Sequence, residues 1–174
     1  MNRIFLTGVP GSRWSGIAQE LENEGNYDIS DRTPERSYTD KGNHVGVYFG
    51  KGMEFPAMLD TKNLDLPYEK KGKKPKLHKS HEWSLMLSTI NYFYPKDGII
   101  LIYRPNEAAL AWWLEAGGFN IAYPNYDYYK DEQTMAKHIA IQNEAILKFA
   151  HKHKLKWKHH HKHYDVLIAK KFPK

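Results

Sequence analysis

Cysteine is absent from this chain of 174 residues. Its absence excludes disulfide bonds, zinc sites built on thiolates and cysteine nucleophiles, so any catalysis must rest on other side chains. Long hydrophobic runs are absent too, and no stretch approaches the length needed to span a membrane. The apolar run within Met1–Leu6 is too short for a signal peptide, and Gly8 to Gly11 interrupt it. We therefore expect a cytoplasmic protein with no membrane partner.

Positive charge and aromatic side chains are what the chain has in excess. There are 26 Lys and Arg residues against 20 Asp and Glu residues, and aromatic residues make up 14% of the chain. The resulting net charge of +6 favours anionic partners, although charge bears on association and not on fold. The length suits one domain with a substantial core, so we expect a single domain over residues 1–174.

Short apolar segments alternate along the chain with segments of helical periodicity. The segment at 98–103 is apolar throughout, as parallel strands buried on both faces are. The alternation predicts a three-layer α/β/α domain with a mostly parallel sheet. The expected strands are 3–8, 44–50, 76–81, 98–103 and 164–169, and the expected helices are 13–24, 83–93, 107–116 and 132–151.

The loop Gly8–Ser15 joins the first strand to the first helix and is rich in Gly, Pro and Ser. Backbone N–H groups at a helix start bind phosphate or sulfate, and Ser12, Ser15 and Arg13 would add hydroxyls and a guanidinium. A plain Gly-Pro turn is the alternative. Aligned with the nucleotide-kinase motif G-x-x-x-x-G-K-[ST], the loop has Arg13 in place of the second Gly and Trp14 in place of the Lys. An ATP or GTP hydrolase is therefore disfavoured.

Two later segments carry groups suited to transfer of an anionic group. Lys79 and His81 lie in an extended segment, where residues two apart point to the same face. The Lys79 cation disfavours the imidazolium form of His81, so the imidazole stays able to accept a proton. Arg104 follows the clearest strand, and ligands of open α/β sheets bind beyond the carboxyl ends of strands. The alternatives are a solvated basic loop at 76–81 and a surface pair of Arg104 with Glu107.

Three segments in chain order resemble the sulfotransferases that use 3′-phosphoadenosine 5′-phosphosulfate (PAPS). That family has a first loop of the type T-x-P-K-S-G-T-[ST] or G-x-P-R-S-G-[TS]-[ST], then P-R-x-x-K-[TS]-H, then R-[ND]-P-x-[DE]. The residues that match are Pro10, Ser12 and Ser15 in the first segment, Lys79, Ser80 and His81 in the second, and Arg104 in the third, where Glu107 roughly fits the acidic position. Gly11 stands in place of a basic residue, Arg13 in place of a Gly and Trp112 in place of a Ser, and the C-terminal R-K-G segment has no counterpart.

The resemblance implies a P-loop NTPase-like fold and transfer of a sulfuryl group from PAPS to a hydroxyl or amine. It implies that Lys79 contacts the sulfuryl group, that His81 is the general base, that Arg104 binds the 3′-phosphate of the nucleotide and that no metal takes part. The acceptor would be a small molecule or a carbohydrate. The departures leave open a divergent, inactive member. The cofactor-binding residues would be Gly8, Pro10, Gly11, Ser12, Arg13, Trp14, Ser15 and Arg104.

Other features keep two alternatives open, a P-loop-like nucleotide kinase or hydrolase and a basic nucleic-acid-associated protein with a degenerate nucleotide fold. The run His151–His163 is rich in His and Lys, but its interleaved lysines repel a metal cation and no nucleic-acid motif accompanies it. Aromatic residues over 112–129 would either line an acceptor groove or pack in the core. His44 and Tyr48 are further candidates for acceptor contact.

Overall fold

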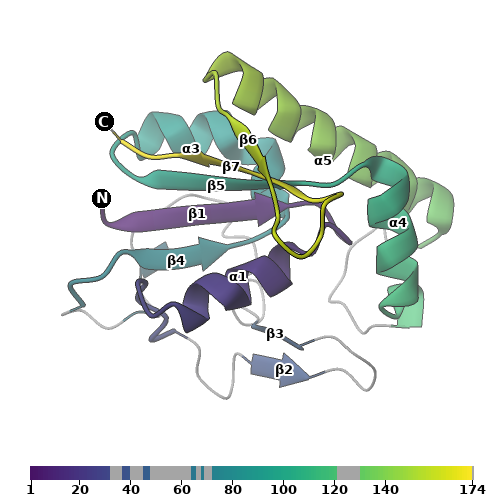
Figure 1. Ribbon diagram of the computed structural model, residues 1–174, viewed down its shortest axis with the longest axis horizontal. Coiled ribbons are helices and arrows are strands. Elements are labelled where there is room, and N and C mark those ends of the chain that lie inside the picture. Colours follow the sequence, from purple (N-terminus) through teal and green to yellow (C-terminus); the bar gives the residue numbers. More distant parts are fainter. Residues whose placement is uncertain are drawn as a thin grey trace.

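The computed structural model describes residues 1–31, 37–39, 45–47, 64–65, 68, 72–120 and 130–173. The helices among them are α1 (Trp14–Asn23), α3 (Leu87–Phe93), α4 (Asn106–Glu115), α5 (Glu132–Lys152) and the 3₁₀ segments η2 (Glu82–Met86) and η3 (Gly118–Asn120). The strands are β1 (Arg3–Gly8), β2 (Ser37–Thr39), β3 (Val45–Val47), β4 (Lys76–Lys79), β5 (Gly98–Tyr103), β6 (Trp157–His159) and β7 (Leu167–Lys171) (Figure 1).

Five of these strands form one mixed sheet in the order β4-β1-β5-β7-β6 (Figure 1). β4, β1 and β5 are parallel neighbours, whereas β7 runs antiparallel to β5 and β6 runs antiparallel to β7. The expectation of a mostly parallel sheet holds only for β4, β1 and β5, and the sheet as a whole is mixed. The loop 160–166 joins β6 to β7, and these strands pair antiparallel because a parallel pair would need a crossover of a dozen or more residues. β6 lies inside the basic His-rich run, where no apolar pattern marks a strand.

The strand expected at 44–50 is observed as β3, and it lies outside the five-stranded sheet. β3 pairs with β2 in a separate antiparallel sheet of two strands. His44 and Tyr48, the candidates for acceptor contact, lie outside the described residues. The segment therefore adds no strand to the parallel part of the main sheet.

Helices cover both faces of the main sheet, which confirms the α/β class (Figure 1). Alternate strand residues point to opposite faces. Ile4 and Leu6 pack with Ile17 and Leu21 of α1 on one face. The other face packs against η2, α3 and α5, with a core that includes Phe5, Ile99, Leu101, Trp83, Ile90, Met135 and Ile139.

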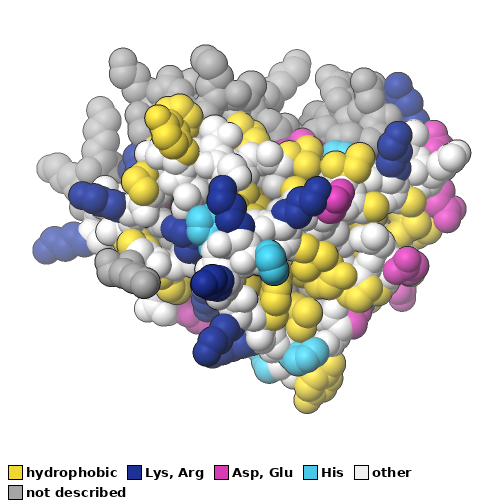
Figure 2. All heavy atoms as spheres, turned by 90° about the horizontal axis from the view of Figure 1, so that it is seen from above, with side chains coloured by type: hydrophobic (Ala, Val, Ile, Leu, Met, Phe, Trp, Pro, Cys, Tyr) yellow, Lys and Arg dark blue, Asp and Glu magenta, His cyan; other side chains and the backbone are white. Residues whose placement is uncertain are grey.

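Charge is unevenly spread over the surface. Seen from above, Lys, Arg and His side chains are spread over the face, and Asp and Glu gather mainly on its right (Figure 2). Such segregation favours directed association with anions. None of the helices in the described part of the chain has both the length and the apolar character that a membrane crossing requires.

An ion-pair cluster lies at the amino end of the parallel strands, away from their carboxyl ends. The Arg3 guanidinium contacts Asp65 at 2.6 Å and Asp97 at 3.0 Å, and His78 Nε2 lies 3.4 Å from Asp65 Oδ1. The His78 ring is only 1% exposed and stacks on Phe5. Burial lowers the pKa of His78, and the hydrogen bond with Asp65 opposes that effect.

We expect the free energy of unfolding to fall as the pH drops below about 6.5, the ordinary pKa of His. A pKa lowered by folding means that the unfolded chain binds the proton more readily, so stability rises with pH in this window. The contribution of His78 is at most about 1.4 kcal/mol per pH unit. Urea unfolding of wild type and His78→Gln between pH 5 and 8 measures it. His78→Gln should flatten the pH dependence, and the exposed control His151→Gln should not; equal slopes for all three chains would contradict the assignment.

Candidate functional site

The loop after β1 is a tight strand-to-helix connection, as its composition predicts. The Ser12 N–H donates to the Val9 carbonyl at 3.0 Å, and Gly11 and Arg13 both have positive φ, at 75° and 65°. A Cβ on Gly11 would lie 1.8 Å from the Ala109 carbonyl oxygen, so the loop touches the backbone of α4. The backbone therefore turns sharply and places the start of α1 at the carboxyl edge of the sheet.

Ser12 is fully buried inside this loop. Its Oγ has no hydrogen-bond partner among the described residues, and it lies over Gly8, where a Cβ would come within 2.6 Å of it. A buried hydroxyl without a partner costs about 1–3 kcal/mol. Buried polar atoms of this kind commonly have a partner that the protein alone does not supply, such as a bound ion. Together with the start of α1, Ser12 is therefore a candidate contact for an anion.

Arg104 joins the end of β5 to the loop. Its Nη1 donates to the Gly11 carbonyl at 3.1 Å, and its Nε donates to Asp165 at 2.6 Å. The buried amide of Asn143 on α5 donates to the Arg104 carbonyl at 2.8 Å and so fixes the backbone at this point. Of the predicted cofactor residues, Arg104 and the Gly8–Ser15 loop are thus brought together.

Arg13 and Arg104 both make cation–π contacts with the ring of Trp112. Their guanidinium carbons lie 4.5 Å and 5.4 Å from the centre of that ring. Burial lowers the pKa of Arg13, and the nearby Arg104 charge lowers it further. Trp112 stands where the sulfotransferase motif has a Ser, and here it forms a cation–π platform that holds two like charges close together. An anion would relieve their repulsion.

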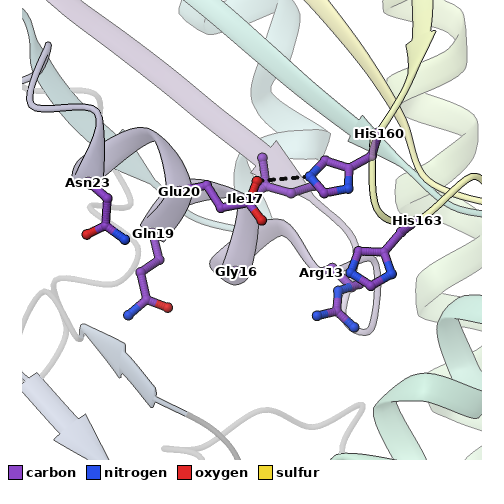
Figure 3. A pocket seen from close by; sticks show the side chains of 8 residues that line it. All are labelled: Arg13, Gly16, Ile17, Gln19, Glu20, Asn23, His160 and His163. Carbon is purple, nitrogen blue, oxygen red and sulfur yellow. Dashed lines mark hydrogen bonds and ion pairs between the residues drawn. The ribbon is translucent and has the colours of Figure 1, made fainter.

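A pocket of about 180 Å³ runs along α1 and is lined at one end by Arg13 (Figure 3). Arg13 and His163 lie at one end of the pocket, and His160 forms part of its wall (Figure 3). His160 Nε2 is 3.0 Å from Glu20 Oε2, and the Lys162 N–H lies 3.3 Å from His160 Nδ1. The remaining lining residues come from α1: Gly16, Ile17, Gln19, Glu20 and Asn23.

Lys79 and His81 do not share one face of an extended segment, as we expected them to. β4 ends at Lys79, and His81 has helical backbone angles at the start of η2. The Lys79 Nζ is buried against α1, 2.9 Å from Glu22 Oε1. Lys79 shares the sheet face of Leu77, which packs against α1, so alternation along β4 places its side chain there.

His81 lies beside the loop after β1. Its ring centre is 6.1 Å from that of Trp14, and the Thr7 hydroxyl donates to its carbonyl at 3.2 Å. Its Nε2 lies 3.3 Å from Glu82 Oε1, which is also 3.3 Å from His138 Nε2 on α5. A carboxylate against an imidazole orients the ring, as a positioned base requires.

Two groups in the described part of the chain have ligand atoms close enough to hold a metal ion. One is Glu20 with His160 and His161, and the other is His81 with Glu82 and His138. In both groups the carboxylate already contacts an imidazole, so pairing without a metal accounts for the geometry. The His-rich run thus contributes two side chains to one group.

Sequence reasoning missed several residues that line or support the site: Glu82, His138, Asn143, His160, His163 and Asp165. His138 and Asn143 both lie on the amphipathic helix α5, and no motif around either residue indicates a role in a site. His160 and His163 belong to the His-rich run, which is visible in the sequence, but its place beside α1 depends on the β6–β7 turn. Of the aromatic residues over 112–129, Trp113 is core and Trp112 faces the two arginines, whereas 121–129 lie outside the described residues.

The groups that can bind an anion and the group that can accept a proton lie along one edge of the sheet. The loop, Arg104 and His81 follow β1, β5 and β4, which are parallel neighbours and end at the same side. Lys79 is instead turned away from this edge, toward Glu22 near the C-terminal end of α1. Comparison of the chain with protein-family models, with curated proteins and with solved structures finds no match.

Proposed function

We propose that the chain is a sulfotransferase that transfers a sulfuryl group from PAPS to a hydroxyl or amine of a small-molecule or carbohydrate acceptor. One observation carries the proposal. The three motif segments, far apart in the sequence, reach the carboxyl ends of the adjacent strands β4, β1 and β5, where the second segment ends at His81 and the other two follow β1 and β5. That edge is where ligands of open α/β sheets bind. A P-loop NTPase-like architecture and a cytoplasmic location belong to the same proposal.

In this proposal the loop and Arg13 hold the phosphosulfate, and Arg104 holds the 3′-phosphate of the nucleotide. The start of α1 offers N–H groups, Ser12 offers its buried hydroxyl, and Arg13 and Arg104 neutralise charge. Sulfuryl transfer needs little covalent chemistry from the protein. By analogy with phosphoryl transfer, the protein positions the donor and stabilises the charge that develops as the group moves.

His81 takes the proton in the proposed step. The acceptor oxygen or nitrogen attacks the sulfur, the bond from sulfur to the bridging oxygen breaks, and adenosine 3′,5′-bisphosphate leaves with that oxygen. The acceptor proton passes to Nδ1 of the His81 imidazole, because Nε2 lies 3.3 Å from Glu82, which orients the ring. Lys79 would reach the transferred group only by exchanging its ion pair with Glu22 for the ligand.

Thermal unfolding with adenosine 3′,5′-bisphosphate tests the proposal. At about 100 times the dissociation constant, the nucleotide should add roughly 2.7 kcal/mol to the free energy of unfolding. For a chain of this size that corresponds to a rise in Tm of roughly 5–10 °C. ATP is the control and should stabilise the chain less, because Trp14 replaces the Lys that kinase loops use for ATP. The absence of any rise at millimolar nucleotide would overturn the proposal.

We expect Arg104→Ala to weaken nucleotide binding by about 1.5–3 kcal/mol, the contribution of a hydrogen bond to a charged group. The reason is that Arg104 is held at the loop by Gly11 and Asp165. Calorimetric titration with adenosine 3′,5′-bisphosphate measures the change. Asp165→Asn is the matched control, because it weakens the same ion pair and leaves the guanidinium in place. Equal losses from Arg104→Ala and Asp165→Asn would mean that the ion pair matters and not a contact with the nucleotide.

A further inference from the structure

We propose that His81, Glu82 and His138 together bind a divalent transition metal ion, and that Zn²⁺ in this site inhibits the chain by occupying His81. The site is inferred from the positions of the three side chains. Its effect on turnover rests on the proposed function, in which His81 takes the acceptor proton. An inhibitory ion takes no part in the reaction, which agrees with what the resemblance implies, and His138 belongs to none of the motif segments.

The distances between the ligand atoms fit a tetrahedral metal ion. Bonds of about 2.0–2.2 Å at tetrahedral angles place neighbouring ligand atoms about 3.3–3.6 Å apart. Glu82 Oε1 lies 3.3 Å from His81 Nε2 and 3.3 Å from His138 Nε2, and the ligand atoms of the three residues all lie within 4.8 Å of one another. Ordinary N–H···O hydrogen bonds are shorter, about 2.7–3.2 Å. Pairing of the carboxylate with both imidazoles therefore holds the three atoms at a spacing that suits a metal ion.

The three ligands come from two elements that the core holds against each other. Glu82 begins η2, His81 directly precedes it, and His138 lies on α5. Trp83 of η2 and Ile139 of α5, the neighbours of these ligands in the sequence, are fully buried members of one core cluster. A site whose ligands are already positioned loses little conformational freedom when an ion binds, and this favours binding.

Gln142 gives an independent indication that a polar ligand binds here. Its side chain is fully buried, and neither Oε1 nor Nε2 has a hydrogen-bond partner among the described residues. It lies one turn after His138 on α5, and helical side chains lean toward the helix N-terminus, so the amide is directed toward His138. A zinc ion with three protein ligands holds a water in its fourth position, and the amide can hydrogen-bond that water.

The chemistry of the donor atoms selects a transition metal. Two imidazole nitrogens and one carboxylate oxygen are a ligand set of zinc sites, whereas Ca²⁺ and Mg²⁺ prefer oxygen ligands alone. The chain has no cysteine, so no thiolate competes for the ion. Zn²⁺ is therefore the ion that this set fits best.

The second group of possible ligands, Glu20 with His160 and His161, is less suited to a metal. His160 Nε2 lies 3.0 Å from Glu20 Oε2, the distance of an ordinary hydrogen bond. The Lys162 ammonium lies 3.3 Å from the other Glu20 oxygen, so a cation already neutralises this carboxylate. His161 is exposed, and it provides a control for ions that bind exposed imidazoles.

A metal ion on His81 would remove its capacity to accept the proton. A neutral imidazole that binds a metal through Nε2 carries its own proton on Nδ1. In the proposed reaction Nδ1 is the atom that receives the acceptor proton. Zn²⁺ should therefore inhibit sulfuryl transfer without weakening nucleotide binding, because the loop after β1 and Arg104 are not among the ligands.

Co²⁺ is the first probe, because it occupies tetrahedral zinc sites and its visible absorption reports the geometry. We expect wild type to give the spectrum of tetrahedral Co²⁺, and Zn²⁺ to displace the ion. His138→Gln and Glu82→Gln should lose this spectrum, whereas the control His161→Ala should keep it. The same spectrum in wild type, His138→Gln and Glu82→Gln would mean an adventitious ion only and would overturn the inference.

Calorimetric titration with Zn²⁺ measures what each group contributes to affinity. Groups that support metal ligands contribute about 10–100-fold, so Gln142→Leu should weaken binding by at least about tenfold and His138→Gln by about a hundredfold or more. Gln142→Leu should also raise the Tm in EDTA, because it removes two buried polar atoms that have no partner. Poor folding would then not account for its loss of affinity. Equal Zn²⁺ affinity in wild type and His138→Gln would overturn the inference.

Turnover and nucleotide binding distinguish failure of the inference from failure of the proposed function. Zn²⁺ that binds as expected to a chain that does not bind adenosine 3′,5′-bisphosphate would support the metal site and overturn the proposed function. Turnover with PAPS that is equal in Zn²⁺ and in EDTA would overturn the inhibitory role and leave the proposed function standing.

Discussion

Replacing His81 with alanine is expected to lower turnover by about a hundredfold or more and to leave nucleotide affinity nearly unchanged. A general base contributes a factor of about 10²–10⁴. His81 is suited to this role because it lies beside Trp14 of the loop and is held by Glu82. The measurement is turnover with PAPS as donor and an acceptor found in a panel of phenols, amines and sugars, together with titration of adenosine 3′,5′-bisphosphate.

Conservative variants separate proton transfer from packing. His81→Asn should be nearly as slow as His81→Ala, because an amide does not accept the proton. His138→Gln is the matched control, since His138 contacts the same Glu82 oxygen from α5 without belonging to the motif. Equal losses of turnover in His81→Asn and His138→Gln would show that the carboxylate cluster matters as a structural unit, and His81 would not be the base.

His78 would be an unsuitable control for this experiment, although it stands in the same segment. The sequence presents 76–81 as one basic stretch, in which His78 and His81 look equivalent. In the fold His78 is a core residue that contacts Phe5, Tyr68 and Trp83. A truncation there would lower turnover by destabilising the chain, so its effect would say nothing about proton transfer.

The parts of the fold that could be predicted are those in which a local pattern determines the outcome. The apolar run of β5 and the strand-loop-helix of Arg3–Asn23 are short-range features, and the structure has them within a residue or two of the expected bounds. β6 could not be predicted, because its residues are polar and it forms only by pairing with β7. The directions of β6 and β7 likewise depend on the path of the chain after α5, which no residue pattern predicts.

In the candidate site, too, some residues could be predicted from local patterns and others depend on contacts made only in the fold. The Gly8–Ser15 loop and Arg104 are each marked by their place after a strand, and parallel neighbours bring them to one edge. Lys79 could not be placed, because its partner Glu22 lies on another element and the sequence does not show which carboxylate a lysine will meet. Trp112 appears in the sequence as a departure from a motif, whereas in the fold it holds Arg13 and Arg104.

We expect Gly11→Ala to destabilise the chain more than any other Gly-to-Ala substitution in the loop after β1. The new Cβ would lie 1.8 Å from the Ala109 carbonyl oxygen, at a φ of +75°. The left-handed conformation costs roughly 1–2 kcal/mol for a residue with a Cβ, and relief of the overlap by moving α4 or the loop costs typically 1–3 kcal/mol more. We therefore expect a loss of about 2–5 kcal/mol in the free energy of unfolding, measured by urea denaturation.

Two other glycines serve as matched controls and separate the two costs. Gly25 has a φ of +70° with no atom within 4 Å of the added Cβ, so Gly25→Ala should cost only the conformational part, about 1–2 kcal/mol. Gly16 is inside α1, also with no atom within 4 Å, and Gly16→Ala should stabilise the chain by up to about 1 kcal/mol. If Gly11→Ala cost no more than Gly25→Ala, the loop would have to sit farther from α4 than the structure places it. Arg104 would then lose its contact with the Gly11 carbonyl, and with it the geometric basis of the proposed anion site.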